Sequence, residues 1–146
     1  MKDPEGPPAE EIVAKIRQSS PEDADVAQEI LDWSRQHFEI RTTAKGWNIA
    51  PEFQQGACTF RPFVIQERNS RALYVDVQNI RSTPPFDTSE NWQEFRKRLV
   101  NMRGVHFEPT PDHDYYKAEY SDLANDDAMK AFQETIVWSI EQVKSN

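Results

Sequence analysis

The chain has 146 residues, a net charge of −8 and a mean hydropathy of −0.83. This length is typical of one domain that buries most of its apolar surface in a single core. No apolar run approaches the length that spans a bilayer, so we expect no contact with a membrane. Residues 1–8 hold three prolines and lack the apolar segment of a signal peptide. We therefore predict a disordered tail at 1–8, a single domain at 9–146 and a cytoplasmic location.

Charge is distributed unevenly along the chain. Residues 1–40 carry ten acids against four bases, residues 41–104 carry six against ten, and residues 105–146 carry nine against three. Overall acidity disfavours non-specific binding to nucleic acid, because neutralisation of phosphates supplies most of that affinity. The basic centre nevertheless keeps nucleic acid open as a partner. The candidate binding residues there are Arg81, Arg96, Lys97, Arg98 and Arg103.

Two helices are predicted before residue 40. The first spans residues 9–18 and has its apolar residues at helical spacing. Ser20 is a typical N-cap residue and Pro21 suits the first helical position, so a second helix begins there and reaches about Phe38. The apolar stripes comprise Ile12, Val13 and Ile16 in the first helix and Val26, Ile30, Trp33 and His37 in the second.

From Gly46 the apolar residues alternate with polar ones, which predicts strands. Pro51 is expected to break the first strand, and Pro62 favours an edge position or a bulge in the second. The third strand places one face in the core and leaves the other polar. The three strands cover residues 47–53, 60–65 and 73–81, with a polar turn at 66–71.

A third helix is expected after the Pro84-Pro85 pair, which cannot continue a strand ladder. Asp87, followed three residues later by Glu90, gives a capping-box pattern with Asp87 as the cap. Gly104 is placed just beyond the C-cap of this helix. The buried stripe, which we expect to pack against the three strands, comprises Trp92, Phe95, Leu99 and Met102.

The remaining chain predicts one more strand and a closing helix. Residues 105–108 form the short strand. The sequence pattern does not decide whether residues 115–120 form an extended segment. Asn125 caps the last helix, which should reach about Lys144. Its inward-facing residues are Met129, Phe132, Ile136, Ile140 and Val143.

These elements predict an α+β fold in the order α-α-β-β-β-α-β-α. An antiparallel three-stranded meander covered by helices makes this a two-layer sandwich. Aromatic residues at helical spacing, such as Trp92 and Trp138, are core candidates. Tyr115, Tyr116 and Tyr120 are less periodic and are expected to be partly exposed.

Few residues suggest chemistry. Cys58 is the single cysteine and lies in a strand-like run, so we expect a buried, reduced thiol without a catalytic role. The sequence contains no glycine-rich phosphate loop, nucleophile elbow or Cys-x-x-Cys motif, and we predict no cofactor. A proline-bounded loop holds several ligand-type residues, but none at a standard zinc spacing, so no metal is predicted there. These residues are His106, Glu108, Asp112, His113 and Asp114.

The order of a helix, a three-stranded meander, a helix and a strand resembles the core of the PD-(D/E)XK nucleases. In that superfamily an acid on the second strand and an acid-x-lysine on the third hold a metal ion that activates water. Asp76-Val77-Gln78 occupies the acid-x-lysine position, with Gln78 in place of lysine. The second strand contains no acid, so Glu52 or Glu29 would have to supply it. The simpler interpretation makes Asp76 and Gln78 the polar face of a half-exposed strand, where Asp76→Asn would scarcely change stability.

A second resemblance covers roughly residues 22–144. Segments including Thr59-Phe60-Arg61-Pro62, Pro84-Pro85-Phe86 and Gly104-Val105, in this order and spacing, are similar to an uncharacterised bacterial domain family. That family implies a fold but no established activity. The sequence thus favours a non-catalytic cytoplasmic module that binds a macromolecular partner or regulates a larger system. The alternative is a degenerate or unusual metal-dependent nuclease using Asp76, Gln78, Glu52 and Glu29.

Overall fold

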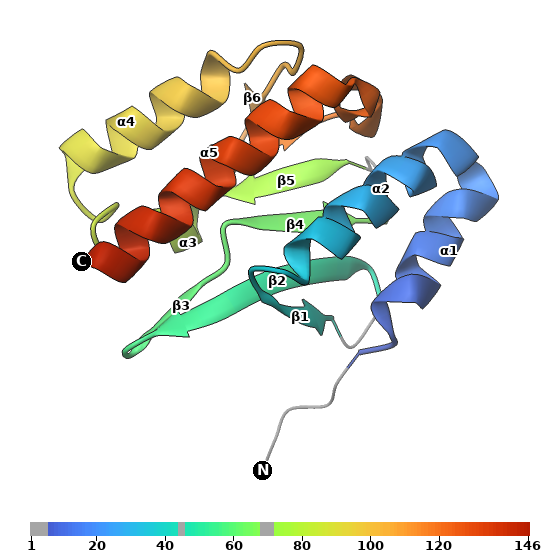
Figure 1. The fold of residues 1–146 in the computed structure, drawn as a ribbon, viewed down its shortest axis with the longest axis horizontal. Coiled ribbons are helices and arrows are strands. Elements are labelled where there is room, and N and C mark those ends of the chain that lie inside the picture. The colour runs from blue at the N-terminus through green and yellow to red at the C-terminus, as the bar shows by residue number, and fades with distance from the viewer. Residues whose placement is uncertain (1–5, 44–45, 68–71) are drawn as a thin grey trace.

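The computed structural model describes residues 6–43, 46–67 and 72–146, and these residues form an α+β fold, as predicted (Figure 1). The helices are α1 (Ala9–Ser19), α2 (Pro21–Ser34), α3 (Val77–Arg81), α4 (Ser89–Val100) and α5 (Asp126–Ser145), with a 3-10 helix, η1 (Tyr120–Ala124). The strands are β1 (Glu39–Thr42), β2 (Asn48–Gln55), β3 (Cys58–Phe60), β4 (Phe63–Gln66), β5 (Leu73–Asp76), β6 (Glu108–Pro109) and β7 (Tyr115–Ala118).

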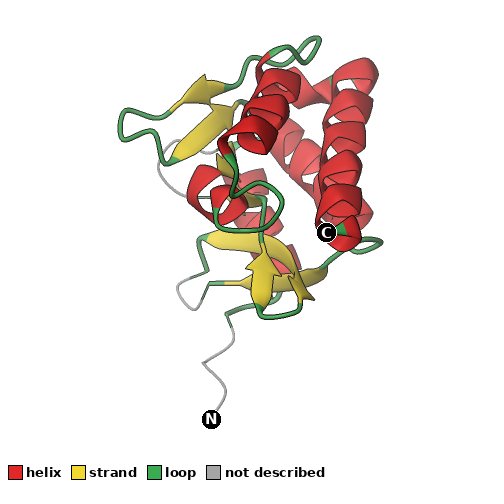
Figure 2. Ribbon diagram, turned by 90° about the vertical axis from the view of Figure 1, so that its left-hand side faces the viewer, coloured by secondary structure: helices red, strands yellow, loops and turns green. Residues whose placement is uncertain are grey.

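The strands form one open antiparallel sheet. Its order is β1-β2-β4-β5-β7-β6, and β3 pairs with the far end of β2 outside this path. In Figure 1 helices α2 and α5 lie in front of the strands and α4 lies beside α5, and Figure 2 shows the molecule turned by 90°. The apolar stripes of the helices and the inward faces of the strands contribute to one continuous core. Among the described residues, no helix is long and apolar enough to cross a bilayer.

The predicted starts of α2 and α5 are confirmed. The Ser20 hydroxyl accepts a hydrogen bond from the Asp23 N–H at 3.2 Å, and Pro21 occupies the first helical position. The predicted end of α2 near Phe38 is wrong, because the helix stops at Ser34. Phe38 instead packs its buried ring against the rings of Phe53 and Phe63, which directs the chain into β1.

The strand predictions are correct in position but wrong in detail. Pro51 does not break β2. Strand β4 pairs with β2 only at Asn48 and Ile49, so no β4 residue requires a main-chain N–H from position 51. The predicted strand at 60–65 is divided at Arg61 and Pro62 into β3 and β4, and β1 was not predicted. Residues 68–71 of the predicted turn and residues 1–5 of the predicted tail lie outside the described residues.

The predicted third strand ends five residues early. Asp76 is the N-cap of α3, and its carboxylate accepts a hydrogen bond from the Asn79 N–H at 3.0 Å. The Asn79 side chain accepts a hydrogen bond from the Arg61 N–H at 2.6 Å and donates one to the Thr59 carbonyl at 2.9 Å. These bonds tie the start of α3 to the break between β3 and β4. Gln78 consequently lies on a helix and not on a strand, contrary to the prediction.

The buried stripe of α4 is confirmed, but its cap and its neighbours differ from the prediction. Thr88, not Asp87, caps the helix by accepting a hydrogen bond from the Asn91 N–H at 3.3 Å. The ring of Phe95 lies 5.4 Å from that of Phe86 and 6.2 Å from that of Trp138. The helix therefore contacts α5 directly, and reaches the strands partly through Phe86. Gly104 comes three residues after the C-cap, Asn101.

Three smaller expectations are also corrected. The strand predicted at 105–108 is largely wrong. The observed strand β6 contains only Glu108 and Pro109, so residues 105–107 lie outside it. Tyr116 and Tyr120 are buried, and the Tyr120 hydroxyl donates a hydrogen bond to the Gln66 carbonyl at 3.0 Å. Cys58 is only partly buried, since β3 extends past the helices at the end of β2.

Candidate functional site

Glu52 is a nearly buried carboxylate held by two arginines. Arg41 Nε lies 3.0 Å from one carboxylate oxygen, and Arg61 Nε and Nη2 both lie 3.0 Å from the other. Glu52 comes from β2 and Arg61 from the break between β3 and β4, so the split strand places the arginine over the carboxylate. Both arginines remain partly exposed, and the arrangement satisfies the buried charge with opposite charges.

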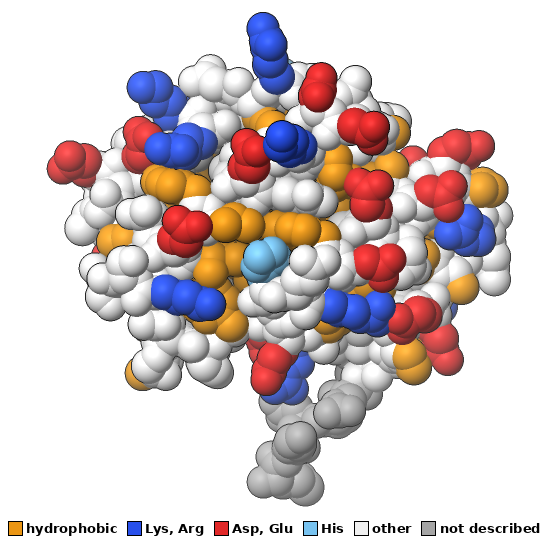
Figure 3. Space-filling view, in the orientation of Figure 1, with side chains coloured by type: hydrophobic (Ala, Val, Ile, Leu, Met, Phe, Trp, Pro, Cys, Tyr) orange, Lys and Arg blue, Asp and Glu red, His pale blue; other side chains and the backbone are white. Residues whose placement is uncertain are grey.

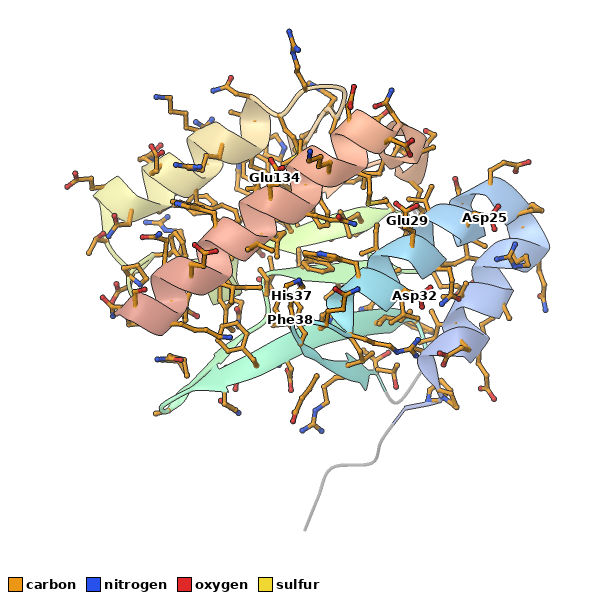
Figure 4. The ribbon with its side chains drawn as sticks, in the orientation of Figure 1. Asp25, Glu29, Asp32, His37, Phe38 and Glu134 are labelled. Atoms are coloured by element: carbon orange, nitrogen blue, oxygen red, sulfur yellow. The ribbon has the colours of Figure 1, made fainter. Side chains whose placement is uncertain are left out.

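Of the residues proposed for a nuclease, Glu52 and Asp76 both interact with the Arg61 guanidinium, and Asp76 and Gln78 both interact with Asp114. Burial raises the pKa of the Asp76 carboxyl, and the Asn79 N–H and the Arg61 charge oppose this shift. The Gln78 side-chain amide donates a hydrogen bond to Asp114 at 2.8 Å. Glu29 is exposed on α2 (Figure 4).

We expect Asp76→Ala to destabilise the protein by about 1 kcal/mol, because the cap of α3 is lost. Asp76→Asn should cost less, since asparagine also caps helices. The raised folded-state pKa means that protonated Asp76 stabilises the fold below the unfolded value of about 3.9, and this contribution is lost as pH rises through the folded pKa. Urea unfolding at pH 3 and pH 7 measures both effects. Equal losses for the two variants would show that capping is not the role of Asp76.

The ligand-type residues of the 106–114 loop lie at or near the surface, and most of them hydrogen-bond to neighbouring side chains. His106 Nε2 lies 2.9 Å from a Glu108 carboxylate oxygen. The Thr110 hydroxyl donates to Asp112 and holds the pKa of that carboxyl below its ordinary value. In the part of the chain that the structure describes, no three His, Cys, Asp or Glu side chains form a group suited to a metal ion.

The structure separates the five basic candidates into two groups. Arg81 lies over the Trp92 ring, 5.8 Å from its centroid, and Arg96 Nε donates a hydrogen bond to the Tyr116 hydroxyl at 2.8 Å. The other three candidates line a hollow of about 430 Å³ between α4 and α5. They are Lys97, Arg98 and Arg103.

We expect only weak binding of nucleic acid at this α4/α5 hollow. Glu94 and Glu134 also line it, and Arg98 Nε lies 3.1 Å from a Glu94 carboxylate oxygen. Fluorescence anisotropy with a single-stranded oligonucleotide at low salt should therefore give a Kd above about 10 μM, within the range of non-specific binding. Sub-micromolar binding that weakens steeply with salt and disappears in a Lys97→Ala/Arg103→Ala variant would contradict this expectation.

A hollow of about 1110 Å³ is lined by β1, by residues 6–10 and by side chains that include Arg35, Glu52 and Arg61. Its three arginines all pair with acids that line the same hollow: Arg35 with Glu10, and Arg41 and Arg61 with Glu52. Because these charges are mutually satisfied, the hollow offers little uncompensated charge to a ligand. Its size alone is weak evidence for a site.

A smaller hollow between α2 and α5 has a different character. We call it the α2/α5 groove; its volume is about 400 Å³, and its apolar lining is Trp33 from α2 with Val137 and Trp138 from α5. All three side chains are partly exposed, and the two indoles also pack against the core. Trp33 is fixed from beneath by the Phe132 ring at 6.1 Å, and Arg98 stacks 4.1 Å from the Trp138 centroid.

The α2/α5 groove is bordered mainly by acids. Figure 3 shows hydrophobic side chains gathered around a histidine in the middle of this face, with carboxylates (red) and Lys and Arg side chains (blue) around them. Figure 4 identifies the histidine as His37 and shows Glu29 on α2 and Glu134 on α5. Glu134 and Glu141 line the groove together with Lys130. Glu29 precedes Trp33 by four residues, so the two side chains share a face of α2.

The sequence analysis did not identify this groove. Trp33 belongs to the apolar stripe predicted for the second helix, and the helical position of Trp138 predicts a core residue. Only the packing of α2 beside α5, which are about 100 residues apart, shows that these indoles border a shared hollow. Comparison with protein-family models, curated proteins and solved structures finds no match to the chain.

Proposed function

We propose that this chain is a cytoplasmic, non-catalytic module that binds a protein partner in the α2/α5 groove. The observation that carries the proposal is the pair of partly exposed tryptophans on neighbouring helices, Trp33 and Trp138. Tryptophan is enriched among the residues that contribute most binding energy at protein interfaces. We also propose that the fold is a two-layer sandwich and that the groove lies on its helical layer.

Rigid support under the groove favours a binding role. Trp33 contacts the rings of Phe63 and Phe132, both of which are fully buried. Trp138 contacts Phe86 and Phe95, which are also buried. Because both indoles are held by core residues, little conformational entropy is lost when a partner covers them.

The test is selection of peptides from an unbiased display library on the folded protein. We expect selected peptides to shift the NMR signals of the Trp33 and Trp138 indole N–H groups and to leave that of buried Trp92 unchanged. Val137→Arg should abolish binding by filling the groove, with circular dichroism and melting temperature showing that the variant is folded. Peptides that bind the Val137→Arg variant equally well would refute a function at this groove.

The non-catalytic part of the proposal predicts that the protein does not cleave DNA or RNA with magnesium or manganese. The Arg61 guanidinium already neutralises Glu52, and a divalent ion needs several oxygen ligands to offset its dehydration. Gel assays of plasmid DNA and single-stranded RNA provide the measurement. Metal-dependent cleavage that is lost in a folded Asp76→Asn variant would overturn this prediction and favour the nuclease.

A further inference from the structure

We propose that the partner segment bound in the α2/α5 groove is a basic amphipathic helix. This inference rests on the proposed function, and adds the chemistry and secondary structure of the bound segment. Three observations support it: the course of the groove along α5, the absence of strand edges in its lining, and the charges at its border.

The groove follows α5 for about three turns. Its α5 lining residues recur at intervals of three and four. They are Lys130, Gln133, Glu134, Val137, Trp138 and Glu141. The twelve residues from Lys130 to Glu141 span eleven steps of 1.5 Å, about 16 Å, so a bound helix of about twelve residues would match the length of the groove. A partner helix lying along this stripe would place residues at i, i+3, i+4 and i+7 against Trp33, Val137 and Trp138.

The groove walls favour a helix over an extended peptide. An extended segment gains most of its affinity by adding to the edge of a sheet through main-chain hydrogen bonds. The described lining of the groove comes only from α2 and α5, whose main-chain groups are hydrogen-bonded within the helices. A helix satisfies its own main-chain groups and needs only side-chain contacts, which Trp33, Val137 and Trp138 provide.

The acidic side chains at the border of the α2/α5 groove favour a basic partner. Glu134 and Glu141 line the groove with Lys130, whose Nζ lies 4.0 Å from Glu134, and Glu29 lies four residues before Trp33 on α2. Arg98 lies over the Trp138 ring, but its guanidinium is paired with Glu94. Among the residues that the structure describes, no cation lies within ion-pair distance of Glu29 or Glu141. Lysines and arginines flanking the apolar stripe of a bound helix would therefore meet uncompensated carboxylates.

The experiment uses two 18-residue helical peptides with the same leucine stripe. One carries lysine and arginine beside the stripe, and the other carries glutamine there. Binding is measured by isothermal titration calorimetry, and the site by the Trp33 and Trp138 indole signals. We expect the basic peptide to bind wild-type protein at least tenfold more tightly than the glutamine peptide, and to weaken as salt is raised.

Two triple variants separate the effect of the charges at the groove from that of the net charge. Each replaces three glutamates by glutamine and so changes the net charge of the chain from −8 to −5. The border variant is Glu29→Gln/Glu134→Gln/Glu141→Gln, and the matched control is Glu11→Gln/Glu22→Gln/Glu90→Gln, which changes exposed residues outside the groove lining. The border variant should bind the basic peptide about tenfold more weakly, and the matched control as wild type does. Both are checked for folding by circular dichroism.

The outcomes distinguish this inference from the proposed function. Equal binding of the basic peptide to both triple variants would show that overall charge drives binding, and would overturn the inference. Library peptides that bind at Trp33 and Trp138 while the basic peptide does not would overturn the inference and leave the proposed function standing. If neither kind of peptide shifts the two indole signals, the proposed function itself fails.

Discussion

Phe95→Ala should lower the free energy of unfolding by about 3–5 kcal/mol, the largest effect that we expect from a single substitution. Phe95 has no exposed surface and lies among the rings of Phe86, Trp92 and Trp138. Removing its ring leaves a cavity between α4 and α5, and neighbouring aromatic rings cannot collapse readily to fill it. The shift of the urea midpoint, with the m-value held constant, measures this loss.

Val100 on the same helix provides the control, because its side chain is 37% exposed. Val100→Ala should change stability by no more than about 0.5 kcal/mol. An unchanged urea midpoint for Phe95→Ala would mean that the buried face of α4 is assigned to the wrong residues.

Asn79→Ala should destabilise the protein by about 2–4 kcal/mol, because two side-chain hydrogen bonds are lost together. The Arg61 N–H loses its acceptor and the Thr59 carbonyl loses a donor, and both bonds are partly buried. The break between β3 and β4 should then open more readily. Urea unfolding gives the overall loss, and faster amide exchange at Arg61 locates it.

Asn79→Asp separates the two bonds. Aspartate keeps an acceptor for the Arg61 N–H but cannot donate to the Thr59 carbonyl when ionised, so the loss should be intermediate. Wild-type stability in Asn79→Ala would show that the Asn79 side chain does not hold the strand break in place.

The helices could be predicted because their signals are local. Ser20 with Pro21, and Asn125 with the acids after it, mark starts that depend only on neighbouring residues. The apolar stripes of α1, α4 and α5 were also correct, since 3.6-residue spacing fixes which face is buried.

The short elements could not be predicted because distant contacts determine them. Leu73 to Gln78 alternates like a strand, yet Asp76 ends β5 by capping α3, and Asn79 bonds to residues about 20 positions earlier. Pro51 looks like a strand breaker, and is tolerated only because β4 stops pairing with β2 before it. Neither fact is visible in a window of a few residues.

The candidate site was predicted least well, for a related reason. The sequence analysis named Asp76 and the basic residues around α4 as candidates, because charged residues in the middle of the chain are easily recognised. Trp33 and Trp138 do not stand out, because a half-exposed tryptophan and a buried one occupy the same position in a helical pattern. Exposure depends on how closely α2 approaches α5.

The central position of α5 has a consequence for synthesis on the ribosome. Phe132 contacts rings from α2, from β4 and from the segment before β6, so α5 joins parts of the core that are distant in sequence. Because α5 is the last of these elements to be translated, Trp33 and Phe63 emerge without the helix that covers them. The nascent chain therefore exposes aromatic surface until α5 leaves the exit tunnel, which makes this interval the one in which chaperone binding or aggregation competes with folding.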